Sequence, residues 1–122
     1  MNAAAVVVED DDELRRHLNP EYRQEDGSYS LAAYKTSNMS LDLCRLRELD
    51  VSVASRGGKW GMSQFLAKVP RASGLVVNYD PIKDDPHDAD NEAHCLIPGR
   101  VNNSQAKKMR EAATVVYDPK PE

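Results

Sequence analysis

The sequence lacks most of the features from which a function is commonly inferred. Its 122 residues include one Trp, one Phe and two Cys. The cysteines, Cys44 and Cys95, are not spaced as Cys-x-x-Cys, so the sequence predicts neither a zinc knuckle nor a redox pair, and we expect both to fill space in the core. Residues 3–8 are apolar, but the run is far too short to cross a bilayer and no basic residue precedes it. We therefore expect a soluble, cytoplasmic protein.

Motifs of the common enzyme classes are absent as well. The sequence contains no Gly-x-Ser-x-Gly, no phosphate loop, no Gly-x-Gly-x-x-Gly and no His-Glu-x-x-His. The formal net charge is −4, which argues against nucleic-acid binding, because that binding draws its affinity from many Lys and Arg side chains on phosphates. The missing motifs argue against an enzyme without excluding one, since catalytic groups can assemble from residues that are distant in sequence.

The length and the 40% hydrophobic content suit one domain with a modest core. We expect a flexible acidic arm over residues 1–13, a domain over residues 14–118 and a short tail over residues 119–122. The run from Glu9 to Glu13 is entirely acidic, which is typical of a solvated tail or a helix start. Alternatively, the arm shields a basic surface or contacts a partner.

Hydrophobic periodicity predicts an α+β fold. Met39, Leu41 and Leu43 alternate with polar residues, which predicts a strand. Further extended segments are expected over residues 29–35, around 51–53, over 75–79 and over 94–98. Helices are expected over residues 63–69 and from Asn103 or Ser104 to about residue 116, and any helix after residue 14 should end before Pro20. We expect a small mixed sheet of about four or five short strands, with two or three helices packed on one face.

The loop between the last two predicted strands concentrates potential ligands, acids and bases. It holds Asp80, Asp84, Asp85, His87, Asp88, Asp90, Glu92 and His94. Such oxygen-rich sets suit divalent metals, but an EF-hand register starting at Asp84 would need glycine where Ala89 stands. Solvated loops also commonly contain acids and prolines. We therefore predict neither a metal nor a cofactor.

His94 stands at the start of a strand, where it could act as a general acid or base or simply form a local hydrogen bond. Arg15, Arg16 and His17 form a basic cluster that could bind an anion or neutralise the acidic run. The candidate catalytic residues are His94, Asp80 and Arg16, with Arg15 as the alternative arginine. The candidate residues for anion or partner binding are Arg15, Arg16, His17, Lys107, Lys108, Arg110 and Trp60. Solvent exposure of the helix that carries the lysines, and packing of Trp60 at a core edge, are the simpler interpretations.

Several short motifs follow one another along the chain. They are Leu14-Arg15-Arg16 with Pro20, Ser30 with Tyr34, Gly74-Leu75-x-Val77-x-x-Asp80-Pro81, Asp85-Pro86, and His94-x-Leu96-Ile97-x-Gly99 with Ala106, Lys107 and Ala112-Ala113. In this order they resemble a group of small uncharacterised bacterial proteins with an Arg-Arg-Ile-His-Pro start, a Gly-Leu-x-Val-x-x-Asp-Pro strand, a His-Ala-x-Ile strand and a closing helix. The sequence departs from that pattern at His17, which does not directly precede proline, at Tyr34, which replaces Phe, and at Cys95, which replaces a small residue. The resemblance implies one small domain and no particular activity.

Two functions are consistent with these observations. The first is a binding or interaction module, accessory or regulatory, that acts through contacts with a protein partner. The alternative is a small hydrolase or nuclease-like toxin in which His94, Asp80 and Arg15 or Arg16 converge. Convergence in one concave pocket would favour the enzyme, whereas scattered side chains and a flat apolar patch would favour the interaction module.

Overall fold

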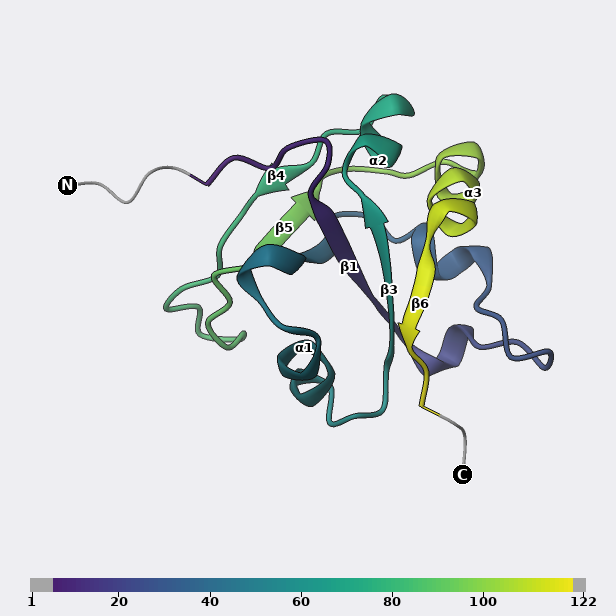
Figure 1. The fold of residues 1–122 in the computed structure, drawn as a ribbon, viewed down its shortest axis with the longest axis horizontal. Coiled ribbons are helices and arrows are strands. Elements are labelled where there is room, and N and C mark those ends of the chain that lie inside the picture. Colours follow the sequence, from purple (N-terminus) through teal and green to yellow (C-terminus); the bar gives the residue numbers. More distant parts are fainter. Residues whose placement is uncertain (1–5, 120–122) are drawn as a thin grey trace.

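Among the described residues, six antiparallel strands form one sheet through the middle of the molecule (Figure 1). The computed structural model describes residues 6–119. The strands are β1 (Glu13–Leu18), β2 (Met39–Leu43), β3 (Gly61–Leu66), β4 (Asn78–Tyr79), β5 (His94–Ile97) and β6 (Thr114–Tyr117). Their order across the sheet is β4-β5-β2-β1-β3-β6. The α+β class is confirmed, with slightly more strands than expected and with antiparallel pairing throughout the described sheet.

Three α-helices accompany the sheet in the part of the chain that the structure describes. They are α1 (Leu49–Ser55), α2 (Lys68–Ala72) and α3 (Asn103–Ala112). The sequence predicted Asn103 or Ser104 as the cap of the last helix, and the cap is the preceding residue, Asn102. Its side-chain oxygen accepts from the Gln105 amide at 2.8 Å, and the Gln105 side chain accepts from the Asn102 amide at 2.9 Å. Within residues 6–119, no helix has the length and apolar character needed to cross a membrane.

Several segments differ from the structure that their sequence patterns predicted. Residues 51–53 are helical in α1, and most of the predicted helix 63–69 belongs to β3. Residues 31–34 form the 3-10 helix η2 (Leu31–Tyr34) in place of a strand, and Val116 lies in β6 in place of the last helix. Since β3 pairs with β1 on one side and β6 on the other and is buried on both faces, it loses the alternation that marks a half-buried strand.

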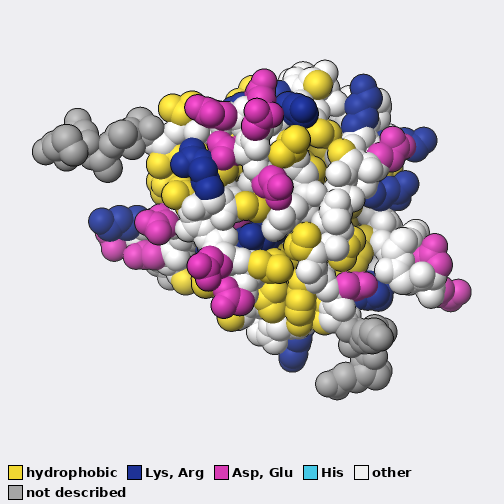
Figure 2. Space-filling model, in the orientation of Figure 1, with side chains coloured by type: hydrophobic (Ala, Val, Ile, Leu, Met, Phe, Trp, Pro, Cys, Tyr) yellow, Lys and Arg dark blue, Asp and Glu magenta, His cyan; other side chains and the backbone are white. Residues whose placement is uncertain are grey.

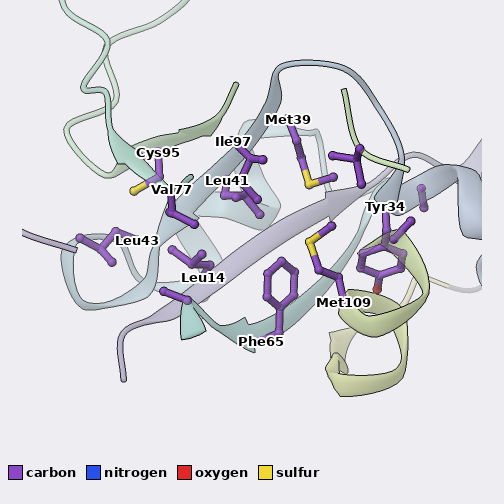
Figure 3. Close-up of a cluster of buried hydrophobic side chains, with 14 of the residues drawn as sticks. Leu14, Tyr34, Met39, Leu41, Leu43, Phe65, Val77, Cys95, Ile97 and Met109 are labelled. Carbon is purple, nitrogen blue, oxygen red and sulfur yellow. The ribbon is translucent and has the colours of Figure 1, made fainter. Parts of the chain in front are cut away.

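One face of the sheet forms the hydrophobic core. Leu14 of β1 pairs with Phe65 of β3, and both are buried on this face together with Leu41 of β2. Helix α3 covers the face and contributes Ala106 and Met109, both fully buried. Figure 3 shows Met109 beside Phe65 among these side chains. Strand alternation therefore leaves the polar residues of β1, β2 and β5 on the opposite face.

Arg16 is an exception on the apolar face. Its guanidinium donates to the carbonyl oxygens of Ala33 (2.9 Å) and Ser40 (3.0 Å) and to the Thr36 hydroxyl (2.9 Å). Burial lowers the pKa of Arg16 to about 10. All three nitrogens of this buried cation thus have acceptors, as a buried charge requires, and they tie β1 to the backbone of β2.

The described part of the expected acidic arm contacts the rest of the protein. Val8 is buried in the core. The Asp12 carboxylate lies 2.8 Å from Arg45 Nε, and the Asp10 carboxylate lies 2.9 Å from Arg71 Nη1. Asp10 and Asp12 therefore neutralise arginines of the same chain, while residues 1–5 of the expected arm lie outside the described residues.

Candidate functional site

The polar face of the sheet carries a pocket of about 400 Å³. Arg15, Asp42 and His94 stand side by side on three strands, because Asp42 of β2 pairs with Arg15 of β1 and with His94 of β5. Helix α1 and the loop of residues 80–93 flank this face at the same end of the sheet (Figure 1). Acidic side chains gather over that loop, at the left of Figure 2. The strands thus form the floor of the pocket, and two connecting segments form its walls.

His94 connects Ser40 to Asp80 within this pocket. Its Nδ1 lies 2.6 Å from the Asp80 carbonyl oxygen and 3.4 Å from the Asp80 carboxylate, and its Nε2 lies 3.0 Å from Ser40 Oγ. A carbonyl oxygen can only accept, so Nδ1 carries the proton and Nε2 accepts from the Ser40 hydroxyl. His94 is buried and Ser40 is exposed. The arrangement has the geometry of a nucleophile, its base and a group that orients the base.

His17 occupies a second polar network beside the first. Its Nε2 lies 2.6 Å from Asp42 Oδ2, and its Nδ1 accepts from Arg56 Nε at 3.0 Å. Since arginine can only donate, Nδ1 is unprotonated and Nε2 donates to the carboxylate. The imidazole is therefore neutral in this arrangement.

Asp42 is the most heavily hydrogen-bonded carboxylate of the pocket. Besides His17, the Ser52 hydroxyl donates at 2.6 Å and the Asn91 amide donates at 2.8 Å. Burial alone would raise the pKa of Asp42, but the hydrogen bonds that it accepts from His17, Ser52 and Asn91 outweigh burial and hold the pKa well below its usual range. Asp42 is therefore ionised, and both of its oxygens are occupied.

Two arginines line the α1 side of the pocket. The Arg56 guanidinium stacks on the Trp60 ring, 4.1 Å from its centroid. The Nε atom of Arg47 is buried and has no hydrogen-bond partner, the one such side-chain atom within residues 6–119. Burial lowers the pKa of Arg56. The negative charges of Asp42 and Asp88 raise this pKa in part, and the positive charge of Arg47 lowers it. In the described part of the chain, neither arginine forms a salt bridge.

The structure brings together only some of the residues that the sequence singled out. His94 and Asp80 meet as expected, and His17 lines the same pocket. Arg15 lies beneath the pocket wall, where its Nη1 donates to the Ser52 hydroxyl and the Arg47 carbonyl, both at 2.8 Å. Arg16 lies on the opposite face of the sheet.

The remaining candidates lie elsewhere or have another contact. Lys107 and Lys108 are exposed on α3, and Arg110 of the same helix is half-buried beside Tyr34. Trp60 is half-buried beneath Arg56. Of this group, only Trp60 supports a residue of the pocket.

Sequence reasoning missed Ser40, Asp42, Arg47 and Arg56. For Ser40 and Asp42 a signal was present, because the alternation over residues 39–43 places both on the face opposite Leu41. No comparable signal marked Arg47 and Arg56, which reach the pocket through the position of α1.

The acidic loop supports its own backbone. One Asp85 oxygen accepts the amides of His87 and Asp88, and one Asp90 oxygen accepts the amide of Asp84. No three His, Cys, Asp or Glu side chains within residues 6–119 form a group that could hold a metal ion. These carboxylates shape the loop and give this wall of the pocket a negative charge.

Comparisons with known proteins add no assignment to this geometry. No protein-family model matches the chain, and neither the curated proteins nor the solved structures yielded a similar protein.

Proposed function

We propose that the protein is a small hydrolase in which Ser40 is the nucleophile and His94 is the general base. The observation that carries this proposal is the pair of contacts made by His94, with Ser40 Oγ 3.0 Å from Nε2 and Asp80 on Nδ1. A serine hydroxyl is a weak nucleophile until an adjacent base takes its proton, and an oriented imidazole is the commonest such base.

The reaction that fits this arrangement is acyl transfer from an ester or amide to water. Ser40 Oγ would attack the carbonyl carbon of the substrate while its proton passes to His94 Nε2. The leaving group would take that proton as its bond to carbon breaks. Water would then attack the acyl-enzyme, giving one proton to His94, and the acid would leave as Ser40 regains its proton. The Asp80 carbonyl and carboxylate would stabilise the imidazolium that forms in each step.

The charge of the pocket favours this chemistry over nucleic-acid cleavage. The loop wall presents Asp80, Asp85, Asp88 and Asp90. A polyphosphate backbone would bring many negative charges against these carboxylates, which costs binding energy at each phosphate. A small ester or amide carries no such penalty.

An interaction module is the second candidate. Leu49, Val53 and Ala54 of α1 form an apolar depression of about 520 Å³ with Tyr117 of β6, and yellow side chains are visible over α1 in Figure 2. An exposed apolar area on a helix can bind a partner. If Ser40 proves unreactive, the interaction module becomes the better-supported of the two functions.

Labelling with diisopropyl fluorophosphate tests the hydrolase. The reagent phosphorylates an activated serine with release of fluoride, so intact mass and peptide mapping should show one adduct, on Ser40. We expect Ser40→Ala to abolish it and His94→Gln to slow it about 100-fold or more, because the base is lost.

Ser37→Ala serves as the matched control, because Ser37 is an exposed serine just before β2 and outside the pocket. It should label like the unaltered protein. Circular dichroism confirms that each variant is folded. Absence of an adduct on Ser40, or equal labelling of the His94→Gln variant, contradicts the proposal.

A further inference from the structure

We propose that the substrate carries a carboxylate group and that Arg47, together with Arg56, binds it. This inference rests on the hydrolase proposed above and specifies its substrate class. It places the carboxylate at the α1 wall of the pocket and the bond to be cleaved over Ser40, at the floor.

The unsatisfied Nε of Arg47 is the first observation. A buried donor without an acceptor destabilises a folded protein by about 1–3 kcal/mol, and more for a charged group. Native proteins contain few such atoms, and each of them calls for an explanation. This atom belongs to a residue that lines the pocket beside the reactive serine. Because Nε itself is buried, a ligand in the pocket would contact the terminal nitrogens of the same delocalised guanidinium group.

The second observation is that two like charges lie together. Arg47 is close enough to Arg56 to depress its pKa. Asp42 and Asp88 also act on the charge of Arg56, but neither forms an ion pair with an arginine of the pocket. Asp42 cannot easily do so, because His17, Ser52 and Asn91 already occupy its two oxygens. An anion between the two guanidinium groups would offset their repulsion, and arginine binds planar carboxylates through paired hydrogen bonds.

The opposite wall limits which anion fits. Asp80, Asp85, Asp88 and Asp90 face the same cavity, so a ligand with more than one negative charge meets repulsion from several carboxylates. A carboxylate satisfies the two arginines with a single charge. A phosphate carries between one and two negative charges at neutral pH, which makes it the less favourable occupant.

Thermal unfolding of the Ser40→Ala variant tests binding without hydrolysis. N-acetylglycine offers a carboxylate next to an amide carbonyl, and N-acetylglycinamide is its uncharged match. We expect millimolar N-acetylglycine to raise Tm, because a ligand that binds only the folded state stabilises it. N-acetylglycinamide should give no shift, and inorganic phosphate a smaller one. No shift with N-acetylglycine, an equal shift with the amide or a larger one with phosphate would overturn the proposal.

Arg47→Met, added to the same Ser40→Ala protein, assigns the effect to Arg47. The double variant should lose the shift given by N-acetylglycine, while an added Arg100→Met should keep it, because Arg100 is exposed and outside this pocket. Without ligand, Arg47→Met should leave Tm unchanged or raise it, since it removes an unsatisfied buried donor. A retained ligand shift, or a marked fall in the ligand-free Tm, contradicts the role given to Arg47.

Ester hydrolysis separates this inference from the hydrolase itself. We expect kcat/KM for mono-p-nitrophenyl succinate to exceed that for p-nitrophenyl acetate, and Arg47→Met to lower this ratio about 10- to 100-fold. If both esters are cleaved at equal rates, the hydrolase stands and the carboxylate site fails. If neither is cleaved but N-acetylglycine still stabilises through Arg47, the hydrolase fails and the carboxylate site stands.

Discussion

Asp42 shows how much one buried carboxylate can organise. It is almost fully buried, yet it is ionised because three donors from β1, α1 and the loop of residues 80–93 converge on it. Its role is to position His17 and to hold the walls of the pocket against the sheet. Removing the carboxylate would leave the buried hydroxyl of Ser52 and the half-buried donors of His17 and Asn91 without their acceptor, and an unsatisfied donor destabilises a fold more than the absence of that donor would.

We predict that Asp42→Asn destabilises the fold by about 2–4 kcal/mol at neutral pH, measured by urea unfolding. The loss should depend on pH. The pKa of Asp42 is depressed in the folded state, so its stabilisation is fully present above the pKa of the unfolded chain, near 4, and falls as pH drops below that value. The stability difference between the two proteins should therefore shrink between about pH 5 and pH 2.

Asp11→Asn provides the comparison, because Asp11 is exposed and no side-chain hydrogen bond of the described residues involves it. It should change stability by less than about 0.5 kcal/mol at any pH. A constant difference between the Asp42→Asn variant and the unaltered protein across this range would show that Asp42 is not ionised in the fold.

Individual elements differ in how clearly the sequence encodes them. Strand β2 matches its predicted bounds of 39–43, because one of its faces meets the core and the other meets the pocket, which preserves the period of two. Strand β3 is buried on both faces and its apolar residues imitate a helical spacing. Helix α1 runs through Val51 and Val53, whose branched side chains favour strands, and Ser52 is held by hydrogen bonds from and to the sheet. Tertiary contacts overrode local preference in both elements.

Helix α3 depends on its capping box. We predict that Asn102→Ala destabilises the protein by about 1 kcal/mol, because the first turn loses the acceptor for the Gln105 amide. Asn103→Ala, one residue further, removes an exposed side chain that makes no cap bond and should have little effect. Equal loss of stability in the two variants, measured by thermal unfolding, would rule out a specific role for the cap.

The candidate site was only partly predictable from the sequence, because it also depends on tertiary contacts. His94 and Asp80 flank one loop, so their proximity follows from the pairing of β4 with β5. Ser40 lies far from them in sequence and joins them only because β2 pairs with β5. Arg16 next to Arg15 looked equivalent in the basic cluster, yet neighbouring residues of a strand point to opposite faces. The missing information was strand order and register.

The fold of the whole molecule buries the thiol of Cys95 and partly buries that of Cys44. Burial raises the pKa of Cys44 to about 11 and that of Cys95 to about 12. Since the thiolate is the reactive form, we predict slow labelling of the native protein by iodoacetamide at pH 8, at least about tenfold slower than a free thiol near pKa 8.5. Cys95 is fully buried and should react only through global unfolding.

Mass spectrometry after labelling checks this, with concentrated guanidinium chloride as the reference in which both residues react. Labelling of Cys95 should slow in step with any substitution that raises global stability. Rapid modification of Cys95 in the native protein would show that β5 opens locally, which would also expose His94 beside it.

Arg16 lies on the core face of the sheet and donates a hydrogen bond to the carbonyl of Ser40, whose side chain lies in the pocket on the other face. Ser40 is thus held from below by a side chain that never enters the pocket, and that side chain is itself held by Ala33 and Thr36. In a selection for the proposed hydrolase activity, we expect substitutions at these positions to be eliminated together with those at Ser40. A map of mutational tolerance would therefore extend the site through the sheet to residues that no substrate touches.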